Sequence, residues 1–195
     1  MSMQGRSLVI LILVVGLAIT FAVACGGGNP AAPSAGQVIF PDSNLEVAVR
    51  EALKIPRNPI YESDVLSLTA LTAHERSISA LTGLEYCTNL VLLDLGENNI
   101  NDISPLAGLT KVEFLILRGN DISDISALAG LNNLEILLLQ QNNISDISAL
   151  VTNSGLVDDI VQLQNNPLSA TSLETYIPKL REKGIILSPI RCDTY

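Results

Sequence analysis

The sequence contains no tryptophan, one histidine, three cysteines and only 4% aromatic residues, and these scarcities argue against several classes of function. One histidine and two cysteines beyond the N-terminal segment leave few ligands for a zinc or iron site and few nucleophiles for covalent catalysis. Basic residues are also scarce, 11 against 20 acidic ones, which gives a net charge of −9. Because phosphate binding needs clustered lysine and arginine, we expect no nucleic-acid partner. The composition predicts no metal, no cofactor and no enzyme activity.

Aliphatic side chains are abundant instead. Leucine and isoleucine account for 52 of the 195 residues, so they must supply most of the buried surface. Such a composition excludes disorder of the whole chain. The length corresponds to one domain.

The N-terminal segment has the features of a secretion signal. Residues Leu8 to Ala24 carry no charge and follow Arg6, and a run of this length is marginal for crossing a hydrocarbon core of about 30 Å. The stretch Ala22-Val23-Ala24-Cys25 resembles the bacterial lipoprotein signal, although leucine is usual where Ala22 stands. The resemblance implies that Cys25 is lipidated and that the protein is extracytoplasmic and membrane-anchored. An uncleaved membrane anchor is the alternative.

A linker separates this segment from the body of the protein. Residues Gly26 to Gly36 are glycine, proline and small or polar residues, a composition typical of flexible tethers. We assign residues 1–24 to the signal peptide and residues 25–37 to the lipidated cysteine and the linker.

The body of the chain repeats at a constant interval. Three copies of the pattern L-x-x-L-x-L-x-x-N-x-I begin at the equally spaced residues Leu90, Val112 and Leu134, and each copy continues with Asp-Ile-Ser. A period of this length indicates stacked units. A degenerate copy with Leu68 and Leu71 precedes them. A last copy fits if two residues are inserted near Thr152 to Gly155.

The pattern has a direct physical interpretation. Alternate residues of a strand point to opposite faces, so the repeated aliphatic residues are expected to point inward and stack into one core. The Asp-Ile-Ser segments are expected to begin turns or short helices on the convex side. Four asparagines fall in one column beyond the strands, where their amides are predicted to satisfy free backbone groups: Asn98, Asn120, Asn142 and Asn166.

These repeats resemble bacterial leucine-rich repeats of the internalin-like type, from about Val38 to Leu187. The resemblance implies an α/β fold, a leucine-rich-repeat solenoid with short parallel strands. Its parts would be a helical N-terminal cap at residues 38–67, repeats at residues 68–168, and a C-terminal capping helix and tail at residues 169–195.

Both caps carry helix signals. Ser43 and Glu46 form a predicted capping box before a helix that ends at Pro56, and Thr171 and Glu174 form a second one. Pro178 is expected to interrupt or kink the second helix. The apolar face of the first helix is predicted to contain Leu45, Val49, Ala52 and Leu53; that of the second contains Leu173, Ile177 and Leu180, and Ile185 to Leu187 are expected to add a final strand.

The cysteines are not expected to form an intrachain disulfide. Several turns separate Cys87 from Cys192, and strands about 4.8 Å apart place them beyond the roughly 7 Å that a disulfide tolerates. Cys87 is predicted to be a small core residue. Cys192 would be a free thiol or pair with another chain.

Function is expected on the concave strand side, where side chains are not dictated by the fold. Its apolar rows would approach the area at which an exposed patch signals binding, with Asp94 and Arg118 fixing the orientation of a protein partner. The predicted binding residues are Leu92, Asp94, Phe114, Ile116, Arg118, Ile136, Leu138, Gln140 and Ile160, with Gln162 and Gln164 nearby.

Other functions remain as alternatives. The face could be covered by a second copy of the chain in a homodimer, or the protein could be a structural component of the envelope without a separate ligand. His74 and the pair Asp158-Asp159 are interpreted as solvated surface groups, because neither has a catalytic partner fixed by the sequence. Polysaccharide binding is not expected, because the chain lacks the aromatic platform that such sites usually contain.

Overall fold

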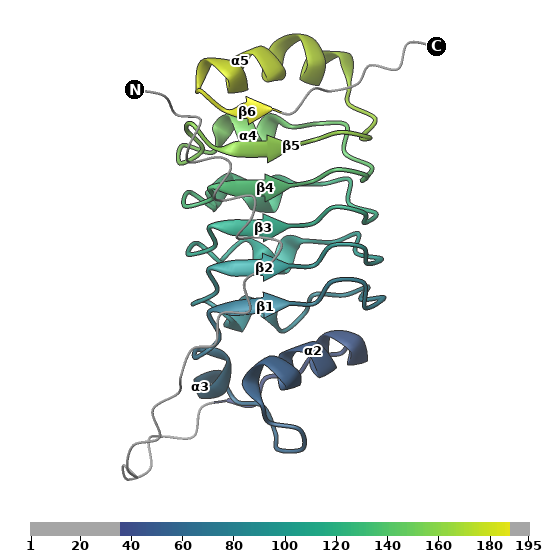
Figure 1. Cartoon of the computed structure of the whole chain (residues 1–195), viewed down its shortest axis with the longest axis vertical. Coiled ribbons are helices and arrows are strands. Elements are labelled where there is room, and N and C mark those ends of the chain that lie inside the picture. Colours follow the sequence, from purple (N-terminus) through teal and green to yellow (C-terminus); the bar gives the residue numbers. More distant parts are fainter. Residues whose placement is uncertain (1–35, 188–195) are drawn as a thin grey trace. The chain divides into compact units, whose positions relative to one another are not determined.

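The computed structural model describes residues 36–187, in which successive turns of the chain each contribute one short strand. The strands form one parallel sheet in chain order (Figure 1). They are β1 (Ala70–Thr72), β2 (Leu92–Asp94), β3 (Phe114–Ile116), β4 (Ile136–Leu138), β5 (Ile160–Gln162) and β6 (Ile186–Leu187). The predicted α/β solenoid with short parallel strands is therefore confirmed. The predicted signal peptide, Cys25 and most of the linker lie outside the described residues.

The register of the strands confirms the period. Leu92 pairs with Phe114, and Phe114 pairs with Ile136, so each step across the sheet equals one repeat of the sequence. The degenerate first copy keeps this spacing, because Ala70 pairs with Leu92. Ile136 pairs with Ile160, and this longer step contains the two-residue insertion predicted in the last copy.

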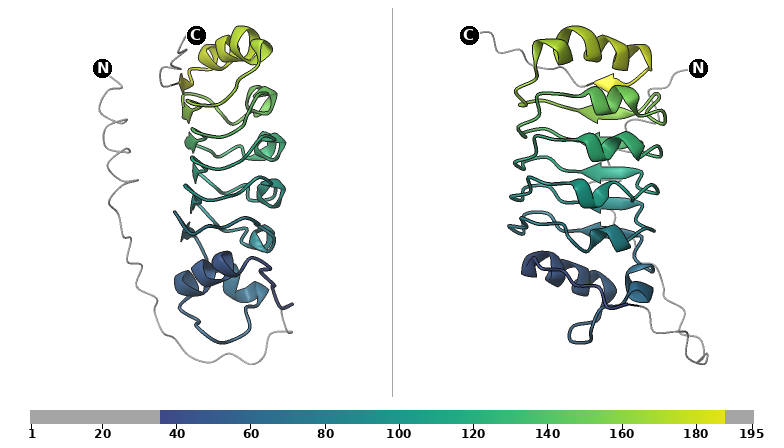
Figure 2. Two further views of the ribbon diagram at one scale, coloured as in Figure 1. Left: turned by 90° about the vertical axis from the view of Figure 1, so that its right-hand side faces the viewer. Right: turned by 180° about the vertical axis from the view of Figure 1, so that it is seen from behind.

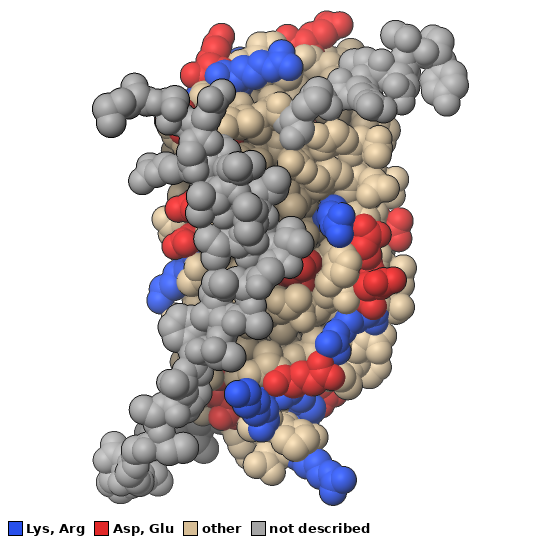
Figure 3. All heavy atoms as spheres, viewed as in Figure 1, with Lys and Arg blue, Asp and Glu red and all other residues tan. Residues whose placement is uncertain are grey.

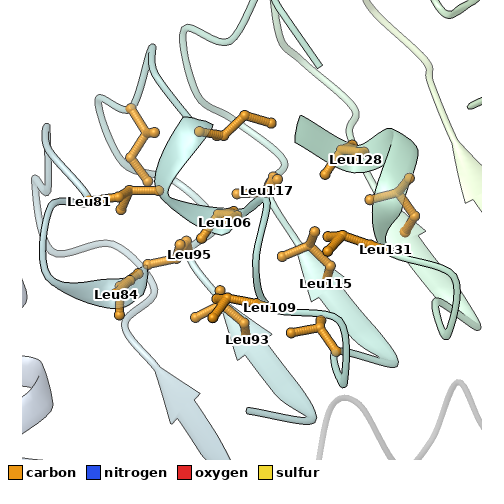
Figure 4. Packing of buried hydrophobic residues seen from close by; sticks show 14 of the residues in the cluster. Leu81, Leu84, Leu93, Leu95, Leu106, Leu109, Leu115, Leu117, Leu128 and Leu131 are labelled. Carbon is orange, nitrogen blue, oxygen red and sulfur yellow. The ribbon is translucent and has the colours of Figure 1, made fainter. Parts of the chain in front are cut away.

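One continuous core fills the space behind the sheet. The middle residue of each strand from β1 to β5 is almost or completely buried, and leucines from the loops opposite pack against it. Figure 4 shows Leu93 of β2 and Leu115 of β3 among leucines that converge from successive turns. Because each turn covers the apolar side of its neighbour, the aliphatic residues are buried by adjacent turns alone, and no contact between distant turns is needed.

The side opposite the sheet is built of short helices (Figure 2). They are η1 (Leu84–Tyr86), η2 (Ser104–Leu106), η3 (Ser126–Gly130) and α4 (Ser148–Thr152). Asp102, Asp124 and Asp146 each accept a hydrogen bond from the backbone N–H of the serine two residues later, at 2.8 Å. The expected role of the Asp-Ile-Ser segments as turn and helix starts is confirmed.

The asparagines form a hydrogen-bonded column, the asparagine ladder, which consists of Asn98, Asn120, Asn142 and Asn166. Asn120 is representative. Its Oδ1 accepts from Ile100 N at 3.0 Å, and its Nδ2 donates to the carbonyls of Leu95 and Leu117 at 3.0 Å. Each amide thus bonds to its own turn and to the preceding one, as predicted from the column.

The N-terminal cap consists of α2 (Ser43–Leu53) and α3 (Glu62–Val65). The predicted capping box is wrong, because Asp42 is the N-cap and its Oδ1 accepts from Asn44 N and Leu45 N. Asp42 is favoured over Ser43 because its second oxygen also accepts from Ser79 N and Ala80 N, which joins the cap to the first repeat.

Three further details describe this cap, and two of them, at Ala52 and Gln37, differ from the sequence prediction. Ala48 is buried on α2, whereas Ala52, predicted on its apolar face, is exposed. Arg76 occupies the place of a ladder asparagine, and its Nη2 pairs with Glu51 Oε2 of α2 at 2.7 Å. Gln37, assigned to the linker from the sequence, forms a bridge with Tyr61.

The C-terminal cap consists of η4 (Ser172–Tyr176) and α5 (Ile177–Glu182), followed by β6 as expected. The predicted Thr171 box is wrong, since Ser169 Oγ accepts from Ser172 N instead. The turn at 172–176 is a π-helix, and such a widened turn relieves the crowding that the ring of Pro178 imposes on a preceding carbonyl. It also rotates the apolar stripe, so that Ser172 is buried and Leu173 is 38% exposed.

Cys87 is a buried core residue with a free thiol, as predicted. Burial, with the charge of Glu85, raises the pKa of this thiol to about 12. Cys192 lies outside the described residues. No helix within residues 36–187 is long and apolar enough to span a membrane.

Candidate strand-face binding site

The predicted binding residues come together on the face of the sheet that points away from the core, which we call the strand face. The middle residue of each strand from β1 to β5 points into the core, so its neighbours point the other way. The strands supply Leu92 and Asp94 (β2), Phe114 and Ile116 (β3), Ile136 and Leu138 (β4) and Ile160 (β5). Arg118 and Gln140 follow two residues after β3 and β4. All nine residues therefore belong to one surface.

The apolar centre of this surface is more closely packed than the sequence suggested. Leu92, Phe114, Leu138 and Ile160 are half-buried, and Ile116 and Ile136 expose only 5% and 4% of their surface. Each isoleucine has paired residues on both sides, and strands about 4.8 Å apart leave little open surface between large side chains. The expectation that all six are exposed is therefore wrong for Ile116 and Ile136.

Glutamines form the polar end of the strand face near β5. Gln140 Nε2 donates to Gln162 Oε1. Within the described part of the chain, Oε1 of Gln140 and of Gln164 is buried and accepts no hydrogen bond. A buried acceptor without a hydrogen bond destabilises the folded protein by about 1–3 kcal/mol. A hydrogen-bond donor would therefore stabilise both oxygens.

The opposite end carries charged side chains. Arg118 Nε lies 4.0 Å from Glu97 Oε1, and His74 Nδ1 lies 3.7 Å from Asp94 Oδ1. Asp94 Oδ1 also accepts from Gly96 N at 3.0 Å, which fixes its carboxylate at the strand end. Both charged residues predicted to orient a partner thus already have neighbours of opposite charge or hydrogen-bonding groups.

A column of carboxylates, which we call the acidic column, was not recognised from the sequence. Glu113, Glu135 and Asp159 each precede a strand, and Glu135 N donates to Glu113 O at 2.8 Å. They follow one another at the same steps as the paired strand residues, so the period could have revealed them. From the sequence, Asp159 was interpreted only as one member of a solvated acidic pair.

The electrostatics of the acidic column are those of uncompensated like charges. Burial raises the pKa of Asp159; a hydrogen bond from Val157 N opposes this effect, and the charges of Glu135 and Asp158 add to it. Within residues 36–187, no ion pair involves Glu113, Glu135 or Asp159. Figure 3 shows acidic side chains at both margins of this view of the molecule, with basic side chains near some of them.

The enzyme alternative depends on His74. This residue lines a cavity of about 380 Å³ together with Asn44, Val47, Glu75 and Arg76. The lining contains no hydroxyl or thiol nucleophile, and the distance of 3.7 Å from Asp94 exceeds that of a hydrogen bond. The cavity therefore contains no hydroxyl or thiol activated by His74.

A second cavity, of about 310 Å³, lies on the helical side between the Asp-Ile-Ser segments of two turns. Its aspartates, Asp124 and Asp146, already accept backbone hydrogen bonds from Ser126 and Ser148. Across residues 36–187, no group of three or more His, Cys, Asp or Glu residues is placed to hold a metal ion.

Comparisons with known proteins agree with this geometry. The family model "Leucine Rich repeats (2 copies)" matches residues 110–152. An internalin (InlF) from Listeria monocytogenes is 30% identical, with a TM-score of 0.58 over 69% of this chain and 47% of that chain. The functional domain of InlJ from the same species is 22% identical and shares the fold, with a TM-score of 0.57 over 70% of this chain and 40% of that one. No curated protein matches the sequence.

The chain thus spans less than half of either internalin structure. The repeat match covers the central turns, and the structural likeness extends over more than two thirds of the chain. Together with the six-stranded parallel sheet, these findings identify residues 36–187 as a leucine-rich-repeat solenoid similar to internalins.

Proposed function

We propose that this chain is a cell-envelope lipoprotein whose leucine-rich-repeat domain binds another protein through the strand face. The observation that carries the proposal is the row of large apolar side chains on β2 to β5 that the core does not use. Large apolar side chains on a face that the fold leaves free are typical of an interface centre, where aromatic and aliphatic anchors supply most of the affinity. Leucine-rich-repeat modules generally act through such contacts.

The membrane attachment is proposed from the sequence. The uncharged run from Leu8 to Ala24 and the small residues before Cys25 support secretion and lipidation. Two acyl chains would anchor the protein stably. Mass spectrometry of the mature N-terminus tests this point, and we expect an acylated Cys25. In detergent phase partitioning, we expect the wild type in the detergent phase and the Cys25→Ser protein in the aqueous phase. A wild-type N-terminus that retains residues 1–24 would contradict it.

Partner capture tests the binding face. The full chain, purified in nonionic detergent, is used to capture proteins from the native envelope, and each captured protein is purified and tested for direct binding. We expect Phe114→Glu and Leu138→Glu to abolish binding, since each places a charge in the apolar centre. Thr110→Glu is the control, because Thr110 is exposed and outside the strands.

The outcomes separate the alternatives. Unchanged binding by a folded Phe114→Glu protein would reject the strand face. Sedimentation of the same proteins measures self-association. A wild-type dimer that dissociates in Phe114→Glu would assign the face to a second copy of the chain instead of a different protein.

A further inference from the structure

Carboxylates border the apolar centre of the strand face on both sides. The acidic column, Glu113, Glu135 and Asp159, lies where the strands begin, and Asp94 and Glu97 lie where β2 ends. Glu135 is exposed, and Glu113 and Asp159 are half-buried. The carboxylates therefore stand beside the hydrophobic residues and not within the core.

Cations are fewer than carboxylates on the same surface, and Lys111, two residues before Glu113, already donates to Asn89 Oδ1 at 2.7 Å. Five segments of the chain form the strand face and its edges: residues 69–75, 91–97, 113–119, 135–141 and 159–165. They contain six carboxylates and one permanently cationic side chain, Arg118. Arg118 lies near Glu97 at 4.0 Å, so it offers nothing to the acidic column on the other side of the face.

The acidic column has a repulsive energy that a partner can relieve. Backbone hydrogen bonds hold Glu135 between its neighbours, with Glu135 N bonded to Glu113 O and Ile160 N bonded to Glu135 O. Three like charges are thus stacked on neighbouring turns without an ion-pairing partner among the described residues. A cation brought beside a half-buried carboxylate gains more than one at a fully solvated site.

We infer that the strand face accepts a segment of a partner protein in which lysine or arginine side chains flank apolar ones, an inference that rests on the proposed function. The apolar side chains of the segment would cover Phe114 and Leu138, and its cations would pair with the acidic column. At the opposite edge of the strand face, the unpaired Oε1 atoms of Gln140 and Gln164 add two acceptors for other donors of the segment.

The charge pattern also distinguishes this occupant from three others. A second copy of the chain would bring a face with the same excess of carboxylates against this one, and like charges across an interface are unfavourable. An acidic partner or nucleic acid would be repelled for the same reason. A basic and apolar segment is the occupant that matches both the charge and the hydrophobicity.

Three synthetic peptides test the inference. The first alternates leucine and lysine, the second alternates leucine and glutamate, and the third alternates serine and lysine. Their affinities for the full chain in nonionic detergent are measured by titration calorimetry at low and high salt. We expect the leucine–lysine peptide to bind at least about tenfold more tightly than the other two, and less tightly at high salt.

Variants locate the contact. Glu113→Gln combined with Glu135→Gln removes two charges without changing side-chain size, and we expect the affinity for the leucine–lysine peptide to fall by about tenfold. The matched control combines Glu174→Gln and Glu182→Gln, which removes two exposed charges from the C-terminal cap. The control is expected to bind as the wild type does, and circular dichroism checks that both proteins are folded.

Several results would overturn the inference. They are equal affinity for the leucine–glutamate peptide, no measurable binding of the leucine–lysine peptide, and an equal loss in the control variant. Dimerisation of the wild type through the strand face would overturn it as well. The three results of the peptide titrations leave the proposed function undecided. That function is tested separately, by whether the Phe114→Glu protein still captures the partner.

Discussion

In β3 and β4, neighbouring residues of the same strand lie in different surroundings. Leu115 and Leu137 are fully buried in the core, whereas Phe114 and Leu138 on the strand face are half-buried. The core position is leucine or valine from β1 to β5, but the strand-face positions vary from alanine and threonine in β1 to phenylalanine in β3. Folding requires a leucine or valine at the core position of every turn. The strand-face positions are free to vary, and for this reason they can carry a binding specificity.

Replacement of adjacent residues in β4 should show the largest difference between the two faces. Leu137→Ala leaves a cavity in the core and should lower the free energy of unfolding by about 2–5 kcal/mol. Leu138→Ala, one residue later, should cost about 1 kcal/mol or less, because its side chain already contacts solvent. Urea denaturation of both proteins measures the difference. Equal losses would mean that the strand face is part of the core.

The asparagine ladder should show a graded effect along the chain. Asn120→Ala removes the hydrogen bonds of a buried amide and should cost roughly 2–3 kcal/mol, since backbone groups of two turns lose their partners. Asn166→Ala, in the last rung, affects a half-buried amide with three side-chain hydrogen bonds against the four of Asn120, and should cost about 1 kcal/mol. Thermal unfolding of both variants checks the order, and the reverse order would contradict the role of burial.

The N-terminal cap gives a smaller and pH-dependent effect. Asp42→Ala should cost about 1 kcal/mol, whereas Ser43→Ala, at the cap expected from the sequence, should be nearly neutral. Burial raises the pKa of Asp42, but hydrogen bonds from Ser79, Leu45 and Ala80 outweigh it and lower the pKa below its ordinary value.

The direction of the pH effect follows from this lowered pKa. The contribution of Asp42 is complete above the unfolded-state pKa of about 3.9 and is lost as the pH falls through the lower folded-state pKa. Denaturation from pH 7 to pH 2 should show the difference between wild type and Asp42→Ala shrinking below about pH 4. A difference in the free energy of unfolding that stays constant down to pH 2 would show that the hydrogen bonds of the Asp42 carboxylate do not stabilise the folded state.

The smallest effect is a gain of stability at the edge of the sheet. Gln141 has a φ of 56°, and Gly119 has a φ of 64° one turn earlier. Gln141→Gly should raise the free energy of unfolding by about 0.5–1 kcal/mol, because glycine adopts this conformation without strain. Gly119→Ala should lower it, since a Cβ there would also contact the Glu97 carboxylate. Changes of the same sign in both variants would contradict this explanation.

Features that recur in every turn were predictable, because one interaction is repeated at a fixed period. The inward leucines, the asparagine ladder and the insertion in the last copy all follow from the spacing, and the structure places them as expected. The caps were not predictable at this level. Both Asp42 and Ser43 can cap a helix, and the choice depends on Ser79 and Ala80, which are distant in the sequence.

The candidate site was predictable only in part. The period placed nine residues on one face, but the burial of Ile116 and Ile136 depends on how large side chains pack between neighbouring strands. The acidic column escaped notice because Thr69 and Val91 occupy its position in the first two turns. The period reveals that these carboxylates recur over three turns, but the strand boundaries are needed to place them beside the strand face.

The equal spacing of the paired strands has a consequence for how the length of this protein can change. Each strand bonds only to the strands of adjacent turns, so stability is close to a sum of nearest-neighbour contributions. Duplication of residues 112–133 would add one complete turn and lengthen the stack by about 4.8 Å, with both caps still seated on their own neighbours. The size of the strand face is thus adjustable in discrete steps without redesign of the ends.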